Sequence, residues 1–519
     1  MQDSAPPDDR RGDPQTVVLG EGPIERLALR FRQGEIDWPT VLQFAKKPAV
    51  SAAITLPYAR AIARWAFETV ADNTELARVL IELLRAATTN LGPDAEARRT
   101  RDSVDLSWLE VTSTTLLHSP NWSVYAQARR FGEALLQRAR ADGNQDLAFS
   151  TLQVLGAMHL DPLTADQPDQ SAWEARWQAW YERGKRAAGA EAMPFPPPAE
   201  ALRIALAYFQ QAADQSEGVR RGHSLKAIVQ TLDWLARVEG RDRKEEIADI
   251  AQQALALLDP VEHFLMTTFL LSAIAEAGRS ISHELLRRLA HRPVEDVIEK
   301  AGAVDATVGV TNLVQLLRRF DPALALDLAL RAEPAAIRSG NENLLVAHHT
   351  ASINALADAL CGEEIDNADG TSKAAERIIA RAEAETWPPG RIAGALIRLA
   401  IGAGGRDEEA EGLVVLKAAE QVARPVFARY EHLLKELRTS LWAGAGVNAY
   451  NAGDAKSAGI CYANATTFAL DLELRAFALE QVDHLVDVAT RGGQDVVLDM
   501  LIVMFSLGPR IRRSWVPQG

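Results

Sequence analysis

Apolar residues recur along most of the chain at the three- and four-residue spacing of an amphipathic helix, and each run ends at turn-forming residues. The first expected helix begins near Pro23, because a proline suits the first turn of a helix, and it ends at Gly34. Further helices are expected over residues 56–71, 74–89, 94–117, 122–141, 145–160 and 168–187. Alternating runs of β-branched residues are scarce, so the pattern predicts an all-α protein.

The segment GAEAMPFPPPAE, residues 189–200, interrupts the helical pattern. Its three consecutive prolines cannot continue a helix and favour an extended polyproline conformation. We therefore expect a Pro-rich linker at 189–200, between an N-terminal helical array over 21–188 and a C-terminal array over 201–508.

Beyond this segment, an apolar helix, a turn and a second Ala- or Leu-rich helix alternate along the chain. The turns follow one another about every 42 residues, at Gly240, Gly278, Asp321, Gly362, Gly405, Gly453 and Gly492. One helical hairpin cannot bury its own apolar stripe, so hairpins that repeat at this period stack on their neighbours. The sequence predicts a right-handed α-solenoid of stacked helical hairpins.

The two ends of the chain depart from the repeat. Residues 1–20 are rich in Pro, Asp and Arg, which predicts a disordered tail rather than a signal peptide. Residues 509–519 form a basic tail. The most apolar window, 496–507, contains Asp499 and is shorter than the roughly 20 residues of a membrane-spanning helix. We expect no membrane span.

Composition narrows the classes of partner. The 47% of hydrophobic residues is typical of a folded protein, and a net charge of −14 argues against binding nucleic acid through bulk electrostatics. The two cysteines, Cys361 and Cys461, lie too far apart in sequence to form a disulfide framework and suit a reducing, cytoplasmic setting.

One expected hairpin matches a known repeat position by position. The spacing W-x2-L-G-x2-Y-x3-G-x-Y-x2-A-x3-F-x2-A is occupied by Trp442, Ala445, Gly446, Ala449, Gly453, Ala455, Ala458, Tyr462 and Ala465. This stretch resembles the tetratricopeptide repeat, with Ala in place of Leu and of both Tyr residues. Residues 133–160 resemble the longer repeats of bacterial tetratricopeptide arrays, and the rest of the chain also fits a HEAT-like repeat.

The resemblance implies an interaction module whose first helices present a groove to a peptide or a partner helix. Carried onto the best-matched unit, the groove residues are Ser440, Ala443, Val447, Tyr450 and Asn451. The Lys/Asn clamp for a C-terminal carboxylate is absent, because Ala443 and Val447 stand in its place. We therefore expect a non-catalytic scaffold, adaptor or regulatory subunit that binds a protein or peptide, in a bacterial signalling or defence pathway with a separate effector enzyme.

The apolar window near the C-terminus provides a second candidate interface. A solenoid's last helix is normally polar on its outer face, whereas residues 496–507 are apolar nearly all round. Either this segment folds back into the array, or it mediates self-association or contact with a partner through Leu501 and Phe505.

Sequence motifs for catalysis and cofactor binding are missing. The chain has no phosphate-binding P-loop, dinucleotide fingerprint, nucleophile elbow or H-E-x-x-H motif. His348 and His349 are adjacent, so on a helix they point about 100° apart and are poorly placed to share one metal ion. Trp173, Trp177 and Trp180, with Tyr181, are spaced as one face of a helix and are interpreted as an apolar packing stripe. We expect no catalytic residue, no metal and no cofactor.

Two other functions remain open. The first is an enzyme on a helical toroid that acts on a glycan through paired carboxylates, although 6% aromatic residues is low for a sugar-binding cleft. The second is a nucleic-acid-binding helical repeat, which the net charge disfavours.

Overall fold

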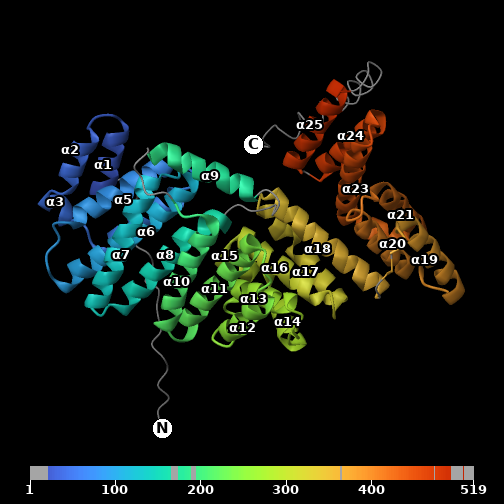
Figure 1. Ribbon diagram of the computed structural model, residues 1–519, viewed down its shortest axis with the longest axis horizontal. Coiled ribbons are helices and arrows are strands. Elements are labelled where there is room, and N and C mark those ends of the chain that lie inside the picture. The colour runs from blue at the N-terminus through green and yellow to red at the C-terminus, as the bar shows by residue number, and fades with distance from the viewer. Residues whose placement is uncertain are drawn as a thin grey trace, which may run out of the picture. The chain divides into compact units, whose positions relative to one another are not determined.

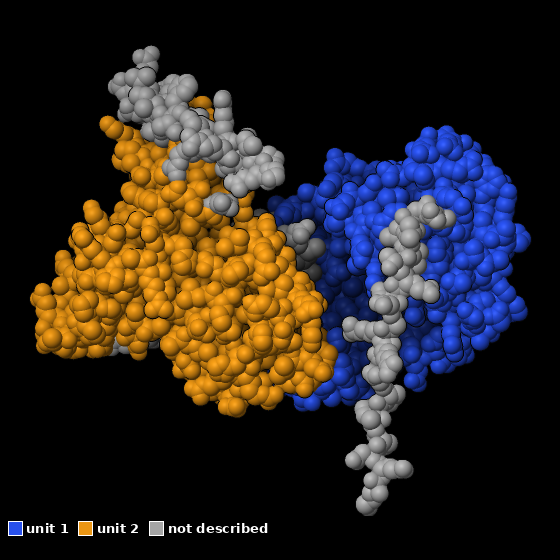
Figure 2. Space-filling model, turned by 180° about the vertical axis from the view of Figure 1, so that it is seen from behind, with its two compact units in different colours: residues 1–257 blue, residues 258–519 orange. Residues whose placement is uncertain are grey.

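The structure is a computed structural model that describes residues 22–164, 173–188, 195–362, 365–366, 368–472, 474–491 and 507. These residues form twenty-five α-helices and no strand, which confirms the predicted all-α fold of stacked hairpins. The chain divides into two compact units, residues 1–257 and 258–519, coloured separately in Figure 2. The predicted tails, 1–20 and 509–519, lie outside the described residues.

The first unit consists of helices that follow one another closely in sequence (Figure 1). They are α1 (Pro23–Arg32), α2 (Trp38–Ala45), α3 (Pro48–Ser51), α4 (Leu56–Thr69), α5 (Thr74–Thr88), α6 (Ala95–His118), α7 (Trp122–Ala141), α8 (Gln145–Thr164), α9 (Trp173–Ala188), α10 (Pro198–Asp214), α11 (Gly218–Glu239) and α12 (Lys244–Leu255).

The second unit continues the same organisation. Its helices are α13 (Phe264–Glu276), α14 (His283–Ala290), α15 (Val294–Ala301), α16 (Ala303–Leu317), α17 (Pro322–Arg338), α18 (Glu342–Cys361), α19 (Thr371–Glu385), α20 (Pro389–Ala403), α21 (Glu409–Val422), α22 (Arg424–Arg429), α23 (Glu431–Asn451), α24 (Ala455–Asp471) and α25 (Arg475–Arg491).

Local capping explains why helix starts in the first unit lie close to their predicted positions. Asn73 accepts a hydrogen bond from the Leu76 backbone N–H at 3.0 Å and caps α5. Asp94 accepts from the Ala97 N–H at 2.8 Å and caps α6. Each such cap stabilises its helix by about 1 kcal/mol. The helix boundaries are therefore set largely by neighbouring residues.

Three helices of the first unit form a connected row. Helix α4 packs on α5 and α6, and α6 packs on α7 and α8. The fully buried Leu80, Ile81 and Leu84 of α5 supply much of the apolar surface against which α4 and α6 rest. Burial of each such side chain stabilises the fold by about 1.5–3 kcal/mol. Helices α4 and α6 of the row therefore rest on the apolar face of α5.

Two local features of the first unit differ from the sequence prediction. Helix α8 does not stop at Asp161–Pro162 but runs through Pro162 to Thr164. A proline so close to the end of a helix removes only one backbone hydrogen bond, and Leu160 and Leu163 are buried on either side of it. The short helices α2 and α3 were not predicted, because they are too short to show a helical period.

The Pro-rich segment predicted as a linker lies within the first unit, and its described part begins at Phe195. Phe195 is 2% exposed and packs with its ring centroid 4.9 Å from that of Tyr125 and 5.0 Å from that of Trp180. Trp180 itself is buried, as expected for the aromatic stripe, and donates to the Leu116 carbonyl. Beyond the prolines, α10 packs on α8.

The predicted turns between repeat helices fall between consecutive helices wherever the structure describes them. Gly362 and Gly453 adopt left-handed backbone conformations, with φ of 72° and 80°, after α18 and α23. Glycine favours this conformation because it lacks a Cβ atom. The last predicted turn, at Gly492, lies outside the described residues.

The second unit also joins helices that are far apart in sequence. Helix α18 packs on α16, α17 and α20, as in a simple array, and in addition on α23 and α25. Glu342, in the first turn of α18, accepts hydrogen bonds of 2.8 Å from the backbone N–H groups of Arg475 and Ala476 at the start of α25. Repeats of an ideal solenoid contact only their neighbours, so this unit is more closed than the sequence period implies.

Candidate binding groove

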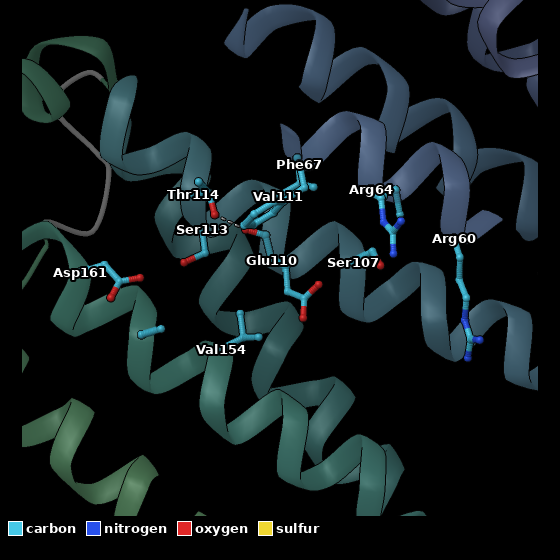
Figure 3. Close-up of a pocket in the computed structure, with 12 residues that line it drawn as sticks. Arg60, Arg64, Phe67, Ser107, Glu110, Val111, Ser113, Thr114, Val154 and Asp161 are labelled. Carbon is cyan, nitrogen blue, oxygen red and sulfur yellow. Dashed lines mark hydrogen bonds between the residues drawn. The ribbon is translucent and has the colours of Figure 1, made fainter. Parts of the chain in front are cut away.

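A cavity of about 430 Å³ opens on the row of α4, α6 and α8 in the first unit (Figure 3). The "groove", as we call it, is lined from α4 by Arg60, Ala63, Arg64 and Phe67, from α6 by Ser107, Glu110, Val111, Ser113 and Thr114, and from α8 by Val154, Ala157 and Asp161. All three helices contribute residues three, four or seven positions apart, which lie on one face of a helix. The groove is therefore a continuous surface built by three successive hairpins.

The floor of the groove is apolar. Val111, Val154 and Ala157 line it, and Phe67 stands beside them with 51% of its surface exposed. A phenylalanine this exposed contributes little hydrophobic stabilisation to the fold. A ligand that covered it would bury a large apolar side chain and gain binding energy. The floor can thus contribute hydrophobic binding energy.

Two arginines border the groove on the α4 side. Arg60 and Arg64 are both exposed, and neither has an ion pair or hydrogen bond with any residue that the structure describes. They are one helical turn apart, so their guanidinium groups lie along the same side of the groove (Figure 3). This edge offers two cationic groups, each with five N–H donors.

Two carboxylates lie elsewhere in the groove, Glu110 on α6 and Asp161 on α8 (Figure 3). Burial raises the pKa of Glu110, and it raises the pKa of Asp161 to about 6 although the positive charge of Lys226 acts in the opposite direction. Neither carboxylate forms an ion pair within the described residues. Asp161 is therefore mostly charged at neutral pH, in surroundings that penalise the charge.

The groove has no constellation for covalent catalysis. Its hydroxyl groups belong to Ser107, Ser113 and Thr114, and Thr114 donates to the Glu110 backbone carbonyl at 3.1 Å. In Figure 3 the Glu110 carboxylate points towards the side on which the arginines lie, and Asp161 lies on the opposite side. In the part of the chain that the structure describes, no group of three or more His, Cys, Asp or Glu side chains is arranged to hold a metal ion.

The groove residues predicted from the tetratricopeptide resemblance lie elsewhere, on α23 of the second unit. Ser440, Val447 and Asn451 are exposed, and Ala443 and Tyr450 are half-buried. The Tyr450 hydroxyl donates to Asp487 of α25 at 2.6 Å, so this side chain already has a partner inside the unit. Binding through α23 stays a prediction.

The hairpin that carries the resemblance is closely packed. A Cβ atom added to Gly446 of α23 would lie 2.7 Å from a ring carbon of Tyr462 in α24, so the contact requires glycine. The Tyr462 ring in turn stacks on His484 of α25, with centroids 5.0 Å apart. The small-residue positions of the motif are thus used to bring the two helices together.

The second candidate interface, at Leu501 and Phe505, lies outside the described residues. Within the window 496–507 the structure describes Leu507, which is buried against Tyr462, Leu485 and Val488. Whether 501 and 505 form an interface stays a prediction.

His348 and His349 are both buried and have different partners, in keeping with a packing role. His348 has its Nε2 atom 3.0 Å from the Ala329 carbonyl oxygen and its Nδ1 atom 3.1 Å from the Thr311 hydroxyl. Burial lowers the pKa of His348 to about 4, so its ring is neutral near pH 7.

His349 lies in a buried charge cluster between α17, α18 and α23. Its Nε2 atom is 3.3 Å from Glu333 Oε1, its Nδ1 atom is 3.7 Å from Glu436 Oε2, and His432 Nε2 is 3.2 Å from the same Glu333 oxygen. Burial alone would lower the pKa of His349, but the two carboxylates outweigh it and raise the pKa to about 9. The ring is therefore a buried cation that joins helices far apart in sequence.

Comparisons with known proteins add little to these observations. No family model matches the chain, and no curated protein matches it. A solved structure described as a circular tandem repeat protein with novel repeat topology and enhanced subunit contact surfaces covers 95% of each chain at 13% identity, with a TM-score of 0.15. None of the described helices combines the length and the hydropathy needed to cross a membrane.

Proposed function

We propose that this protein is a non-catalytic scaffold, adaptor or regulatory subunit, and that its first unit binds a segment of a partner protein in the groove. One observation carries the proposal: three successive hairpins line a single open cavity that has an apolar floor, an exposed Phe67 and charged groups without an ion pair among the described residues. Buried charges in proteins are normally paired with opposite charges. Charged groups without an ion pair at an open cavity therefore favour recognition of a ligand.

The tetratricopeptide-like hairpin α23–α24 supports the same class of function. Arrays of that family present their first helices to peptides or partner helices, and α23 would offer Ser440, Val447 and Asn451 as a second, independent surface. Partnership with a separate effector enzyme in a bacterial signalling or defence pathway belongs to this proposal.

Peptide selection on the full-length protein tests the proposal. Random peptides displayed on phage are selected on the immobilised protein, resynthesised with a fluorophore and titrated by fluorescence anisotropy. Ala157→Trp fills the groove and should abolish binding of the selected peptides, whereas Ala141→Trp, at an exposed site at the end of α7, should not. Peptides that bind the two variants and the wild type equally would contradict the proposal.

A second candidate, a glycan-acting enzyme, has one observation in its favour. Glu110 and Asp161 are two carboxylates with raised pKa values in one cavity, and an elevated pKa is what a general acid requires. The orientation in Figure 3 is less favourable, because the Glu110 carboxylate points away from Asp161. Hydrolysis of soluble polysaccharides that is lost in Glu110→Gln would favour this candidate over the binding scaffold.

A further inference from the structure

We propose that the occupant of the groove is a protein segment that carries a basic, an apolar and an acidic side chain on one face. Asp161 binds the basic side chain on one side of the groove, the apolar floor takes the apolar one, and Arg60 and Arg64 bind the acidic one on the other side. Glu110 offers a second carboxylate between them (Figure 3). This inference rests on the proposed function and adds the chemistry of the ligand to it.

The acidic part of the groove selects a cation. Glu110 and Asp161 are half-buried, and no described residue forms an ion pair with either. The positive charge of Lys226 in α11 lowers the pKa of Asp161 but does not offset the effect of burial. A lysine or arginine of a bound segment would compensate the charge of Asp161 in a site that water only partly reaches, where charge pairing is stronger than at an open surface.

The basic part of the groove selects an anion. Arg60 and Arg64 are one turn apart on α4 and can hold the two oxygens of a carboxylate from a fork of N–H donors. A polyanion such as nucleic acid does not suit the groove, because the phosphates beyond the arginines would approach Glu110 (Figure 3). The groove is lined by two basic and two acidic side chains, and Asp161 lies on the side opposite the arginines (Figure 3). An occupant that carries a basic group and an acidic group apart from each other suits this arrangement.

The apolar floor sets the kind of molecule. Phe67, Val111 and Val154 come from three different helices of the cavity wall, and in Figure 3 Asp161 lies on one side of them and Arg60 and Arg64 on the other. A free amino acid could reach one charged edge but would leave Phe67 exposed. A segment of a protein covers the floor and reaches both edges together.

The composition of selected peptides tests the proposal. Peptides selected on the wild type should be enriched in Lys or Arg at one position and in Asp or Glu at another. Selection on the variant Glu110→Gln/Asp161→Asn should lose the basic enrichment and keep the acidic one. In the peptide that binds the wild type best, replacing the basic residue by Gln should weaken binding about tenfold to the wild type and have little effect on the double variant. Free arginine at the same concentration should not compete.

Two outcomes separate the inference from the proposed function. Selected peptides that lose binding to Ala157→Trp but show no enrichment in Lys or Arg would overturn the inference. The proposed function would then still stand. Peptides that ignore Ala157→Trp would overturn both.

The stability of the double variant provides a measurement that needs no ligand. Carboxylates that are kept for binding and have no ion pair among the described residues should destabilise the free protein. Glu110→Gln/Asp161→Asn should therefore raise the melting temperature at neutral pH while it weakens peptide binding. A lower melting temperature would show that the carboxylates have a structural role and would overturn the inference.

Acidification provides a third measurement at the same site. Asp161 becomes neutral as the pH falls through about 6, so peptide binding should weaken between neutral pH and pH 5. The Asp161→Asn variant should bind more weakly and lose this pH dependence. An unchanged profile in that variant would contradict the role of Asp161.

Discussion

The two units use charged side chains in opposite ways. In the first unit, Arg60, Arg64, Glu110 and Asp161 surround an open cavity and have no ion-pair partner among the described residues. In the second unit, His349 is buried between Glu333 and Glu436 and joins three helices. We propose that the charges of the groove serve recognition at the expense of stability, whereas the cluster around His349 links helices of the second unit.

The largest effect should come from removing the buried cation. His349→Leu leaves Glu333 and Glu436 facing each other without the ring between them, and it should lower the free energy of unfolding by about 3–5 kcal/mol. Urea unfolding followed by circular dichroism measures this loss. As a control, His349→Leu/Glu436→Leu should recover part of it, since the second carboxylate is then also gone. A loss below about 1 kcal/mol would mean that the cluster does not hold the helices together.

Alkaline pH should weaken the same cluster without a mutation. The pKa of His349 is raised from 6.5 to about 9 in the folded protein, so its contribution is fully present below pH 6.5 and is lost as the pH rises through 9. We expect the free energy of unfolding to fall by about 2–3 kcal/mol across this window. The His349→Leu variant should show a correspondingly flatter profile. Equal slopes in the wild type and the variant would contradict the assignment.

Neutralising the carboxylates of the first unit should act in the opposite direction. The pKa of Asp161 is raised from 3.8 to about 6, so its charge destabilises the fold above pH 6 and has no effect below pH 3.8. Glu110→Gln/Asp161→Asn should therefore gain about 1–2 kcal/mol at neutral pH. Urea titrations at neutral pH and at a pH below about 4 should show the gain at the first and its absence at the second.

The smallest effect is expected for the arginines of the groove. Arg60 and Arg64 are exposed and without ion pairs in the described residues, so Arg60→Ala/Arg64→Ala should change the free energy of unfolding by less than about 0.5 kcal/mol. Thermal unfolding measures the change. A larger loss would mean that the arginines stabilise the first unit, and the contrast between the units would weaken.

The sequence predicted the helices well because their limits are local. Asn73 and Asp94 cap helices whose first residues follow directly, and Gly453 ends α23 through its own backbone conformation. Such signals need no knowledge of distant residues. Most helices could therefore be predicted from the sequence. Their stacking could be predicted too, because each helix has an apolar face that must be buried.

Two segments that contain prolines, one at Pro162 and one near Phe195, differ in the structure from the sequence prediction. The pattern predicts a helix over 145–160 that ends before Pro162, yet α8 continues past this proline and carries Asp161 into the groove. When Asp161 is expected in a turn, its place in the groove cannot be predicted. Near Phe195 the prolines do interrupt the helices, but the buried ring anchors the segment within the first unit. The apolar residue beside the prolines was the signal that could have shown this.

The buried cluster could not be predicted from the sequence. Glu333 and His349 lie in neighbouring helices, but Glu436 and His432 reach them only because α18 packs on α23. A repeat period predicts contacts between neighbouring hairpins only. It does not predict that α18 packs on α23, which lies much further along the chain. The charges of the groove were equally hidden, since Arg64, Glu110 and Asp161 come from three hairpins.

We propose that the groove of the first unit binds a protein segment that carries both charged and apolar side chains. The most direct measurement is the affinity of a selected peptide for the wild type, Ala157→Trp and Glu110→Gln/Asp161→Asn by fluorescence anisotropy. We expect Ala157→Trp to abolish binding, and we expect the double variant to weaken it about tenfold while remaining at least as stable as the wild type. Equal affinity for all three proteins would contradict the proposal.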